Sequence, residues 1–467
     1  MQSLQTNIPP KRWIDVETLI VNKKRCCGCG VCASSCPIDG CISIKFDKNR
    51  EYLAQVDHEK CINCGKCLKV CPDDYTYFDK IVKKLSQKNN DFISNELIGP
   101  YYKNYVGYVT QTKGRLQSAS GGLLSELLIY LMKNSEIDGA AVAIPTDPSS
   151  GKLFECKIVR SVEEIKSSRG TKYYPIEYSK VLNEIKGSEG RFAVVGTPCV
   201  INAIRKLEYI NKDFRGKILY YLALVCGHNV SAAYTEFLIK KNEILYETVK
   251  KVKYRDKKGI TNASNFSLMI DSSQGVTRFP FFNTDFGLSW YNLMFSLNKC
   301  LYCPDFAGIF SDASFADAWL PEYIKDVRGT SIVIVRDQRV DNILKKMIDS
   351  KYIYLQSISL EKVINSQKQQ IKFKQEDIKC RIAFKKLFNR NFPDYNINWA
   401  YRDYFKSFGE VNSLMLRVHL SKLLYRWGIL KIISTKGYVY SLRPFLFIKV
   451  LLSKVKKYLM NLKYSYL

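Results

Sequence analysis

The sequence has 467 residues, 46% of them hydrophobic, and a formal net charge of +28. This length and composition predict about three domains with hydrophobic cores and exclude a largely disordered chain. No stretch offers about 18 consecutive uncharged apolar residues, so we expect no membrane-spanning helix. Residues 1–13 contain no apolar run typical of a signal peptide.

Two identical cysteine runs lie in the N-terminal part of the chain. They read Cys26-x2-Cys29-x2-Cys32-x3-Cys36-Pro37 and Cys61-x2-Cys64-x2-Cys67-x3-Cys71-Pro72. In this spacing, known from bacterial two-cluster ferredoxins, three thiolates meet one cluster and the fourth cysteine ligates the other cluster. Zinc sites are the weaker alternative, because they usually use paired CxxC knuckles. The sequence predicts two 4Fe-4S clusters, one held by Cys26, Cys29, Cys32 and Cys71, the other by Cys61, Cys64, Cys67 and Cys36.

The cysteines and their spacer describe a small module. Ten of the 16 cysteines lie between Cys26 and Cys71, and their need for reduced thiols predicts a reducing cytoplasm. Between the runs, residues 42–46 and 52–56 alternate like two strands of a hairpin. Cys27 and Cys41 are surplus to the eight ligands, and we expect structural or incidental roles for them.

A possible anion site follows the module, at residues 115–123. A helix is predicted to begin directly after Ser118, Ser120, Gly121 and Gly122. Hydroxyl donors and unpaired N–H groups at a helix N-terminus suit a phosphate of a bound nucleotide. The alternative is an ordinary serine N-cap with glycines for tight packing.

The middle of the chain reads as an α/β core. Residues 138–144 and 157–159 are predicted strands, and residues 191–196 and 217–225 are strands that each lead through a turn into a helix. These two turns carry Cys199 and Cys226, so we expect the chemistry at the carboxyl ends of the strands. Cys199 lies near a helix N-terminus, where the dipole favours the thiolate.

Four later cysteines are enough for a third cluster. Cys300 and Cys303 form a CxxC, which joins Cys199 and Cys226 to make the set. The alternative is a redox CxxC with two buried cysteines. Cys156 and Cys380 fit no pattern and are expected in the core.

Short motifs between Tyr101 and Arg339 resemble, in their order and spacing, the beta subunits of coenzyme F420-reducing hydrogenase and F420-linked dehydrogenases. The motifs are Ser118-Ala-Ser-Gly-Gly122, Gly170-Thr-Lys-Tyr173, Val195-Gly-Thr-Pro-Cys199, Cys226-Gly-His228, Tyr254-Arg-Asp-Lys257, Cys300-x2-Cys303 and Ala316-Asp-Ala-Trp319. Similar proteins bind a flavin, usually FAD, beside an iron-sulfur cluster. The alanines at 316 and 318 and the residues after Lys257 depart from the family pattern, so the resemblance does not assign the deazaflavin as substrate.

The resemblance implies a set of flavin and catalytic candidates. Lys172 and Tyr173 contact a flavin or its phosphates in one interpretation and are surface loop residues in the other. His228 and Asp317 are candidates for protonating substrate or flavin, with a structural hydrogen bond as the alternative for each. The candidate flavin-binding residues are Ser118, Ser120, Gly121, Gly122, Lys172, Tyr173, Thr197 and Asn229.

The C-terminal part is strongly basic. From Cys380 to Leu467 there are 17 Lys or Arg and three acidic residues, a net charge of +14. Residues 414–433 and 445–462 have apolar residues at three- and four-residue spacing, which predicts amphipathic helices. They could form a helical bundle with a solvated basic face, lie on an anionic membrane surface or dock on a partner. Nucleic acid is an unlikely partner, because no recognised motif accompanies the charge.

These features together predict a fold class and a function. We expect an α+β ferredoxin-like two-cluster domain (1–90), an α/β flavin-binding core in two parts (98–185 and 186–365) and a basic, mainly helical tail (366–467). The leading hypothesis is a cytoplasmic iron-sulfur flavoprotein oxidoreductase. It would receive electrons from a ferredoxin-like carrier or a partner redox subunit. Any association with a membrane surface would be through the tail. The alternative is a non-catalytic electron-transfer subunit that docks by its basic tail.

Overall fold

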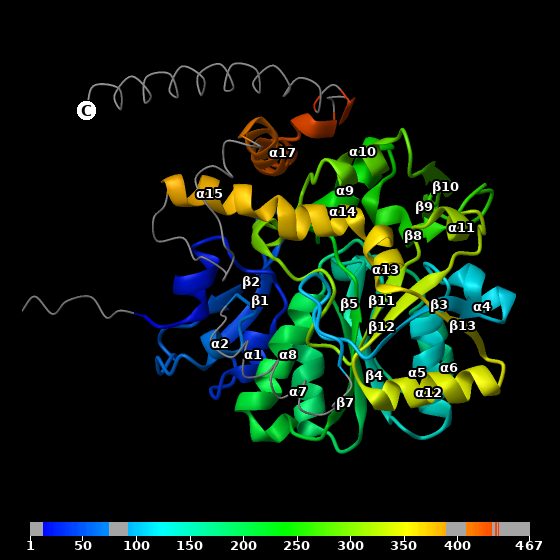
Figure 1. Ribbon diagram of the computed structural model, residues 1–467. Helices are drawn as coiled ribbons and strands as arrows, with labels where there is room; N and C mark the ends of the chain where they lie inside the picture. Colours follow the sequence, from blue (N-terminus) through cyan, green and yellow to red (C-terminus); the bar gives the residue numbers. More distant parts are fainter. Residues whose placement is uncertain (1–12, 74–91, 389–407, 432–434, 437, 439–467) are drawn as a thin grey trace, which may run out of the picture.

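A computed structural model describes residues 13–73, 92–388, 408–431, 435, 436 and 438 (Figure 1). The predicted charged connector at 80–90 and the predicted helix at 445–462 lie outside these residues. Within the described residues, no helix is both long enough and apolar enough to cross a membrane.

The N-terminal module has the predicted hairpin. Its strands β1 (Ile42–Phe46) and β2 (Tyr52–Val56) pair antiparallel, as their alternating sequences predict. Each cysteine run contains a short helix, and the glycine before each helix has a positive φ, 78° at Gly30 and 67° at Gly65, which glycine adopts at little cost. The helices of the module are η1 (Glu17–Val21), α1 (Val31–Ser35) and α2 (Lys66–Lys69).

A mixed sheet of eight strands forms the centre of the molecule and confirms the predicted α/β core. Its order is β13-β3-β12-β11-β7-β6-β4-β5. Strands β4, β6, β7 and β11 are parallel, and β3 has the same direction because it is antiparallel to β12, which is antiparallel to β11. The strands are β3 (Lys103–Val109), β4 (Gly139–Pro145), β5 (Phe154–Val159), β6 (Phe192–Gly196), β7 (Ile218–Leu224), β11 (Ala313–Asp317), β12 (Ser331–Val335) and β13 (Ile353–Ser357).

This strand direction brings the predicted motifs to one edge of the sheet. The loop with Ser118 to Gly122 follows β3, Cys199 follows β6, Cys226 follows β7, and Trp319 follows β11. The carboxyl ends of strands that share a direction lie at the same edge, where α/β proteins bind their ligands. The edge is therefore the place to look for a site.

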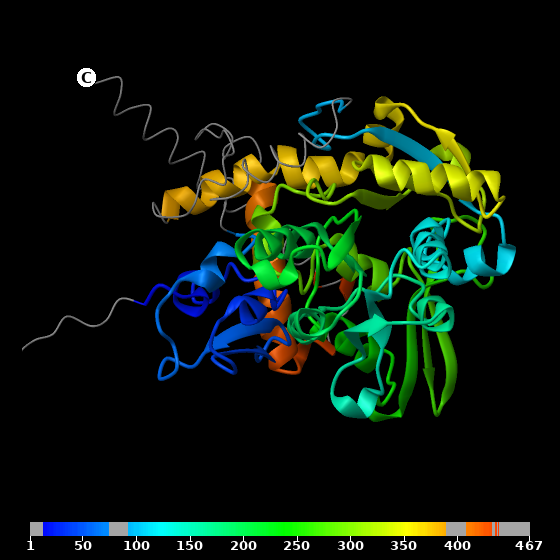
Figure 2. The same cartoon turned by 90° about the horizontal axis from the view of Figure 1, so that it is seen from below.

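Helices cover both faces of the sheet (Figures 1 and 2). One face packs on α5 (Leu123–Lys133), α6 (Val162–Ser167) and α12 (Gln338–Asp349). The other face packs on α7 (Ser179–Gly187), α8 (Pro198–Ile210) and the N-terminal module. The module shares one hydrophobic core with these helices, so it is an integral part of the fold.

A second, antiparallel sheet was not predicted. It has the order β10-β9-β8 and packs against α9 and α10 in an aromatic-rich core. Its elements are β8 (Val249–Asp256), β9 (Ser267–Ser272), β10 (Gly275–Pro280), α9 (Ala233–Lys241) and α10 (Asp285–Tyr291). The remaining short helices are α4 (Thr112–Gln117), η2 (Pro148–Ser150), η3 (Lys212–Phe214), η4 (Tyr246–Thr248), η5 (Asn298–Tyr302), α11 (Pro321–Ile324) and η7 (Ile429–Lys431).

The described part of the C-terminal region is helical and packs on the rest of the protein. Figure 2 shows α17 (Phe408–Arg426) beside the N-terminal module. Its Val411, Met415 and Val418 are buried in one core, and other apolar residues of α17 pack on the core of the small sheet. This favours, for α17, the packed alternative over a membrane-bound helix. The other helices here are α13 (Leu360–Ser366), α14 (Lys368–Ile371), η6 (Lys372–Glu376) and α15 (Ile378–Phe388).

Candidate redox site

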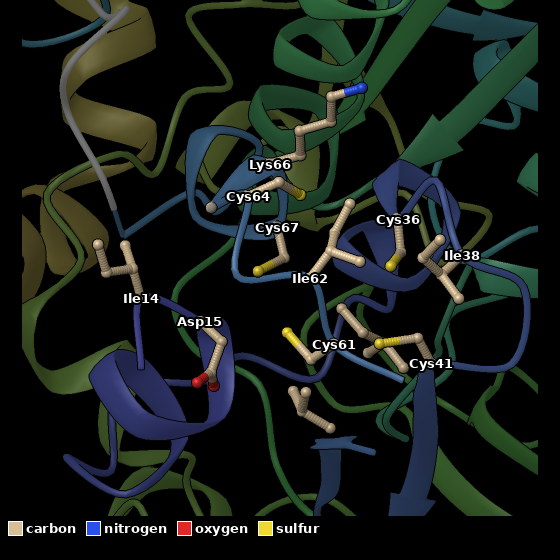
Figure 3. A pocket seen from close by; sticks show the side chains of 13 residues that line it. Ile14, Asp15, Cys36, Ile38, Cys41, Cys61, Ile62, Cys64, Lys66 and Cys67 are labelled. Atoms are coloured by element: carbon tan, nitrogen blue, oxygen red, sulfur yellow. The ribbon is translucent and has the colours of Figure 1, made fainter. Parts of the chain in front are cut away.

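The thiols predicted for the second cluster line one pocket. Cys36 comes from the first cysteine run, and Cys61, Cys64 and Cys67 come from the second (Figure 3). The structure thus brings together one cysteine of the first run and three of the second, as the predicted exchange of the fourth ligand requires. Cys64 is exposed to solvent, so this pocket lies at the surface.

Cys41 also lines this pocket, and this fits the structural alternative of the two roles expected for it. It lies beside Cys36 and Cys61 (Figure 3). Burial, together with these two neighbouring thiols, raises the pKa of Cys41 to about 12. Its thiol donates a weak hydrogen bond to the carbonyl of Asp57, 3.7 Å away. Cys41 is therefore a protonated neighbour of the four predicted ligands.

The thiols predicted for the first cluster gather deeper in the protein. Cys32 interacts electrostatically with Cys26 and Cys71, and Cys29 interacts with Cys32 and Cys71. Burial is the largest cause that raises the pKa of Cys71, to about 12. Thiols with raised pKa values bind iron only with loss of their protons, so assembly of this site releases protons.

A buried charge network ties this first set to the core. Asp73 forms ion pairs with Arg25 and with Lys299, and both Asp73 and Lys299 have side chains no more than 3% exposed. Lys206 of α8 donates to the carbonyl of Cys71, 2.8 Å away. Because Lys299 precedes Cys300, the network joins the module directly to the segment of the third cysteine set.

The four cysteines predicted for a third cluster come together at the sheet edge. The thiol of Cys226 interacts electrostatically with Cys199, Cys300 and Cys303. The backbone N–H of Cys226 donates to the carbonyl of Phe306, 3.0 Å away, which holds the turn after β7 against the CxxC segment. Burial raises the pKa of Cys300 to about 11. The thiols of this set thus come from three segments that are far apart in the sequence: the turn after β6, the turn after β7 and the CxxC at η5.

Cys27 connects the first and third sets. Its thiol lies next to those of Cys29 and Cys199 and interacts with both. Of the two roles expected for Cys27, this position between two sets of predicted ligands fits the structural one. The neighbouring thiol of Cys27, together with burial, raises the pKa of Cys199 well above its ordinary value. These two effects outweigh the preference of the helix N-terminus for the thiolate.

Two of the predicted flavin residues instead contact the third set. The hydroxyl of Thr197, the N-cap residue of α8, lies 3.3 Å from the Cys199 sulfur. The backbone N–H of Asn229 donates to the Cys300 sulfur at 3.2 Å. Hydrogen bonds to sulfur ligands are a known way to tune a cluster. The contacts of Thr197 and Asn229 therefore suit a cluster site.

His228 lies in a row of aromatic rings that contact one another at tilted angles. The ring centroid of Trp290 is 4.0 Å from that of His228 and also 4.0 Å from that of Tyr173. Burial lowers the pKa of His228 to about 3, with a smaller effect of Lys374 in the same direction, so the imidazole is neutral. Its Nε2 atom is buried and has no hydrogen-bond partner among the residues that the structure describes. Such an atom fits a bound group that supplies the missing partner.

Asp317 is held by an arginine. Nη1 of Arg255 lies 2.8 and 2.9 Å from the two carboxylate oxygens of Asp317. Arg255 is buried and also covers the ring of Trp319, at 5.2 Å from the ring centroid. This geometry favours the structural alternative for Asp317 over a role as proton donor.

The serine hydroxyls of the 118–122 loop are used inside the protein. Ser118 donates to the carbonyl of Gly114 (2.8 Å), and Ser120 donates to that of Thr330 (2.6 Å). A Cβ at Gly121 would lie 2.6 Å from the carbonyl oxygen of Gly107, and Gly122 has a φ of 85°. The predicted hydroxyl donors toward an anion are therefore wrong for this structure, whereas the tight packing that requires glycine is present.

Two half-buried lysines lie at this end of the site. The ammonium of Lys172 donates to the carbonyls of Ser168, Arg169 and Gly170. That of Lys257 donates to the carbonyls of Arg115, Ser120 and Arg328 at 2.6 to 3.0 Å. Burial lowers the pKa of each lysine to about 7.

These lysines fit the diphosphate of a flavin nucleotide. Each ammonium donates only to neutral carbonyls, and Lys257 also lies near the carboxylate of Asp317, which already pairs with Arg255. An anion would supply both lysines with a direct ionic partner. The residues present thus fit a flavin at two points, the cations near the 118–122 loop and the partnerless Nε2 of His228. Tyr173, predicted to contact flavin, contacts Trp290 in the aromatic row.

Sequence reasoning missed several residues of this site. Lys257 stands in one of the family motifs, but no role was assigned to it. Cys27 could have been found through its position beside Cys26. The ion network of Asp73 and the aromatic contact of Trp290 have no local signal, because their partners are distant in the sequence.

The chain matches known families over most of the described core. Residues 104–183 match the N-terminal part, and residues 189–361 match the C-terminal part, of the coenzyme F420 hydrogenase/dehydrogenase beta subunit. Residues 25–75 match a 4Fe-4S dicluster domain. The first two matches together cover more than half of the chain.

Individual relatives give the same family. The chain is 25% identical to the F subunit of the F(420)H(2) dehydrogenase of Methanosarcina mazei, over 68% of this chain and 84% of that protein. It is 23% identical to the coenzyme F420-dependent sulfite reductase of Methanocaldococcus jannaschii, over 59% of this chain and 41% of that protein. A chain in the structure of the F420-reducing NiFe hydrogenase complex from Methanosarcina barkeri has a similar fold, with a TM-score of 0.50 and 21% identity over 66% of this chain and 99% of that chain.

Proposed function

The chain belongs to the family of coenzyme F420 hydrogenase/dehydrogenase beta subunits and carries a 4Fe-4S dicluster domain, and from this premise we propose that it is an iron-sulfur flavoprotein oxidoreductase with a third cluster site. The observation that carries the proposal is the gathering of Cys199, Cys226, Cys300 and Cys303 at the sheet edge, next to the first thiol set. An iron-sulfur cluster accepts or gives up one electron at a time, whereas a flavin exchanges one or two. A protein that holds both groups therefore connects one-electron carriers with two-electron partners.

The positions of the three thiol sets support an order in which electrons would pass from one set to the next. The second set lies at the surface with Cys64 exposed, and the first set is next, since Cys32 interacts with both Cys71 and Cys67. Cys27 then adjoins Cys29 on one side and Cys199 on the other. The protein's own contribution is to fix these sets in sequence, from the surface to the sheet edge.

For the flavin, we assign binding and orientation to residues at the sheet edge. Lys172 and Lys257 would neutralise its diphosphate, and Gly121 lets the 118–122 loop approach β3 and β12 closely. The neutral His228, in contact with Trp290, would offer Nε2 to a polar ring atom. Asp317 positions Arg255 through their ion pair and does not itself transfer a proton.

A second candidate function is a non-catalytic electron-transfer subunit of a larger complex. The name of the relative from Methanosarcina mazei, one subunit of a dehydrogenase, favours a partner protein in a complex with this chain as well. In that case the substrate site lies on the partner, and the thiol sets serve only as a path for electrons.

Metal and flavin analysis of the protein, purified without oxygen, distinguishes the two functions. We expect about twelve irons with equal sulfide and one flavin per chain for the oxidoreductase. About eight irons and no flavin would support the simple carrier. Neither iron nor flavin after anaerobic reconstitution would contradict both.

A further inference from the structure

A buried lysine outside the family match faces the third thiol set. Lys374 lies in the π-helical turn η6 and is 1% exposed. The matched family region ends at residue 361, so no resemblance assigns a role to this residue. Isolated π-turns are frequent at functional sites.

The helices around Lys374 pack directly on the thiol-bearing segments. Nε of Arg381 in α15 donates to the carbonyl of Leu301, inside the CxxC, at 2.6 Å. A Cβ at Gly227, the residue after Cys226, would lie 3.7 Å from Cγ of Gln370 in α14. The segment on both sides of Lys374 is therefore anchored on the third set.

The charge of Lys374 has no paired carboxylate among the described residues. Within this part of the chain, it forms no ion pair with Asp or Glu at 4.0 Å or less, although the carboxylate of Asp305 lies near it. Its strongest interactions are with the thiols of Cys303, Cys300, Cys226 and Cys199, in that order. A buried charge is costly unless a negative group lies close to it, so a negatively charged group at these thiols would stabilise this lysine.

We propose that Lys374 is the counter-charge of the group held by Cys199, Cys226, Cys300 and Cys303, and that it raises the reduction potential of that group. This inference rests on the proposed function, because it requires a cluster at these cysteines. A 4Fe-4S cluster with four thiolates carries about −2 when oxidised and gains one negative charge on reduction. A nearby cation stabilises the more negative form more strongly, which makes reduction easier.

This charge would direct electrons inward. The second set lies at the surface, where solvent screens charges, whereas the third set has a fixed cation in a buried place. A raised potential at the third set favours the transfer of electrons to it.

The test is a redox titration followed by EPR on three variants, with iron analysis of each. Lys374→Met removes the charge, Lys374→Arg keeps it, and Lys372→Met removes an exposed charge from the same turn. We expect Lys374→Met to make reduction of one cluster at least about tenfold less favourable, which for one electron is about 59 mV. The other two clusters, and all clusters of the two control variants, keep their potentials.

The remaining outcomes are also decisive. Loss of about four irons from Lys374→Met but not from Lys374→Arg supports the inference, since the charge is then needed to retain the cluster. A full iron content with an unchanged potential in Lys374→Met overturns the inference and leaves the proposed function intact. A wild-type protein with only about eight irons overturns the proposed function and this inference with it.

Discussion

At the scale of single residues, the site depends on a few buried groups whose charge is set by their surroundings. Burial lowers the pKa of both Lys257 and His228, because it disfavours the charged form of each side chain. Cys27 shows a different effect, since its importance comes only from the thiols on either side of it. Such residues make the binding of anions and metals dependent on pH.

Lys257 gives a prediction for flavin binding. Because its pKa is about 7, the ammonium loses its proton as the pH rises above 7, and the protein must take up a proton to bind the diphosphate. The dissociation constant for FAD should therefore increase by up to about tenfold per pH unit above pH 7. Lys257→Met should bind FAD more weakly at pH 6 and with a flatter pH profile, measured by fluorescence titration. Lys258→Met, at an exposed neighbour, should behave like the wild type, and an unaltered pH profile in Lys257→Met would argue against the site.

Cys199 tests the assignment of the third thiol set. Cys199→Ser should lower the iron content by about four atoms per chain and leave the signals of the two ferredoxin clusters in place. Cys156→Ser is the matched control, because Cys156 is a buried cysteine of β5 that belongs to none of the three sets. Equal iron contents in Cys199→Ser and wild type would show that Cys199 is not a ligand.

At the scale of elements, helix α17 stabilises the protein by packing on two cores. Val418 is fully buried, and Ser421 accepts a hydrogen bond from the backbone of Phe295 at 3.0 Å. Lys422 pairs with Glu51 of the N-terminal module at 2.5 Å. The helix therefore bridges the module and the core.

The packing of α17 can be measured directly. Val418→Ala should lower the free energy of unfolding by about 2 kcal/mol, since it removes two buried methyl groups and leaves a cavity. Denaturant unfolding of the loaded protein without oxygen provides the measurement. Trp427→Ala, at a side chain that is 62% exposed, serves as control with a change below about 0.5 kcal/mol. Equal stability of Val418→Ala and wild type would mean that the helix does not pack as described.

At the scale of the whole molecule, the structure joins a ferredoxin module to an α/β core as one body. The module shares a hydrophobic core with α7 and α8, and the Asp73 network crosses the same boundary. A fixed boundary keeps the distance between the first and third thiol sets constant. The pocket of the second set remains at the surface, with Cys64 exposed.

The Asp73 network gives a prediction for this boundary. Asp73→Asn leaves Arg25 and Lys299 without their shared carboxylate, and removing one partner of a buried ion pair typically costs about 3–5 kcal/mol. Asp57→Asn weakens the solvent-exposed pair with Lys60 and should cost much less, because solvent screens exposed pairs. Thermal unfolding of both variants compares the two losses, and similar losses would contradict a stabilising role of the network.

The surface pocket gives a prediction for the electron donor. Ile62 is 61% exposed beside Cys61, so it does not support the fold. Ile62→Glu should slow reduction by a ferredoxin-like carrier several-fold, because a charge in the contact face opposes docking. Reduction by dithionite should proceed at the wild-type rate. An unchanged rate with the carrier would place electron delivery on another face.

The sequence by itself determined the parts of this protein that depend on local order. The hairpin of residues 42–56 and the strand-turn-helix units around Cys199 and Cys226 were predicted correctly. Their signal is the hydrophobic period, which is a local property of a chain, as is the spacing of the cysteines. The same holds for the family, since its motifs are short and follow in a fixed order.

Only the tertiary structure decided how these parts meet. It placed Cys27 between two thiol sets, turned the hydroxyls of Ser118 and Ser120 inward, paired Asp317 with Arg255 and brought Lys374 to the third set. Each of these contacts joins groups whose partners are chosen by the packing of the fold. Burial then fixes their charges, and burial is a property of the whole structure that no local pattern contains.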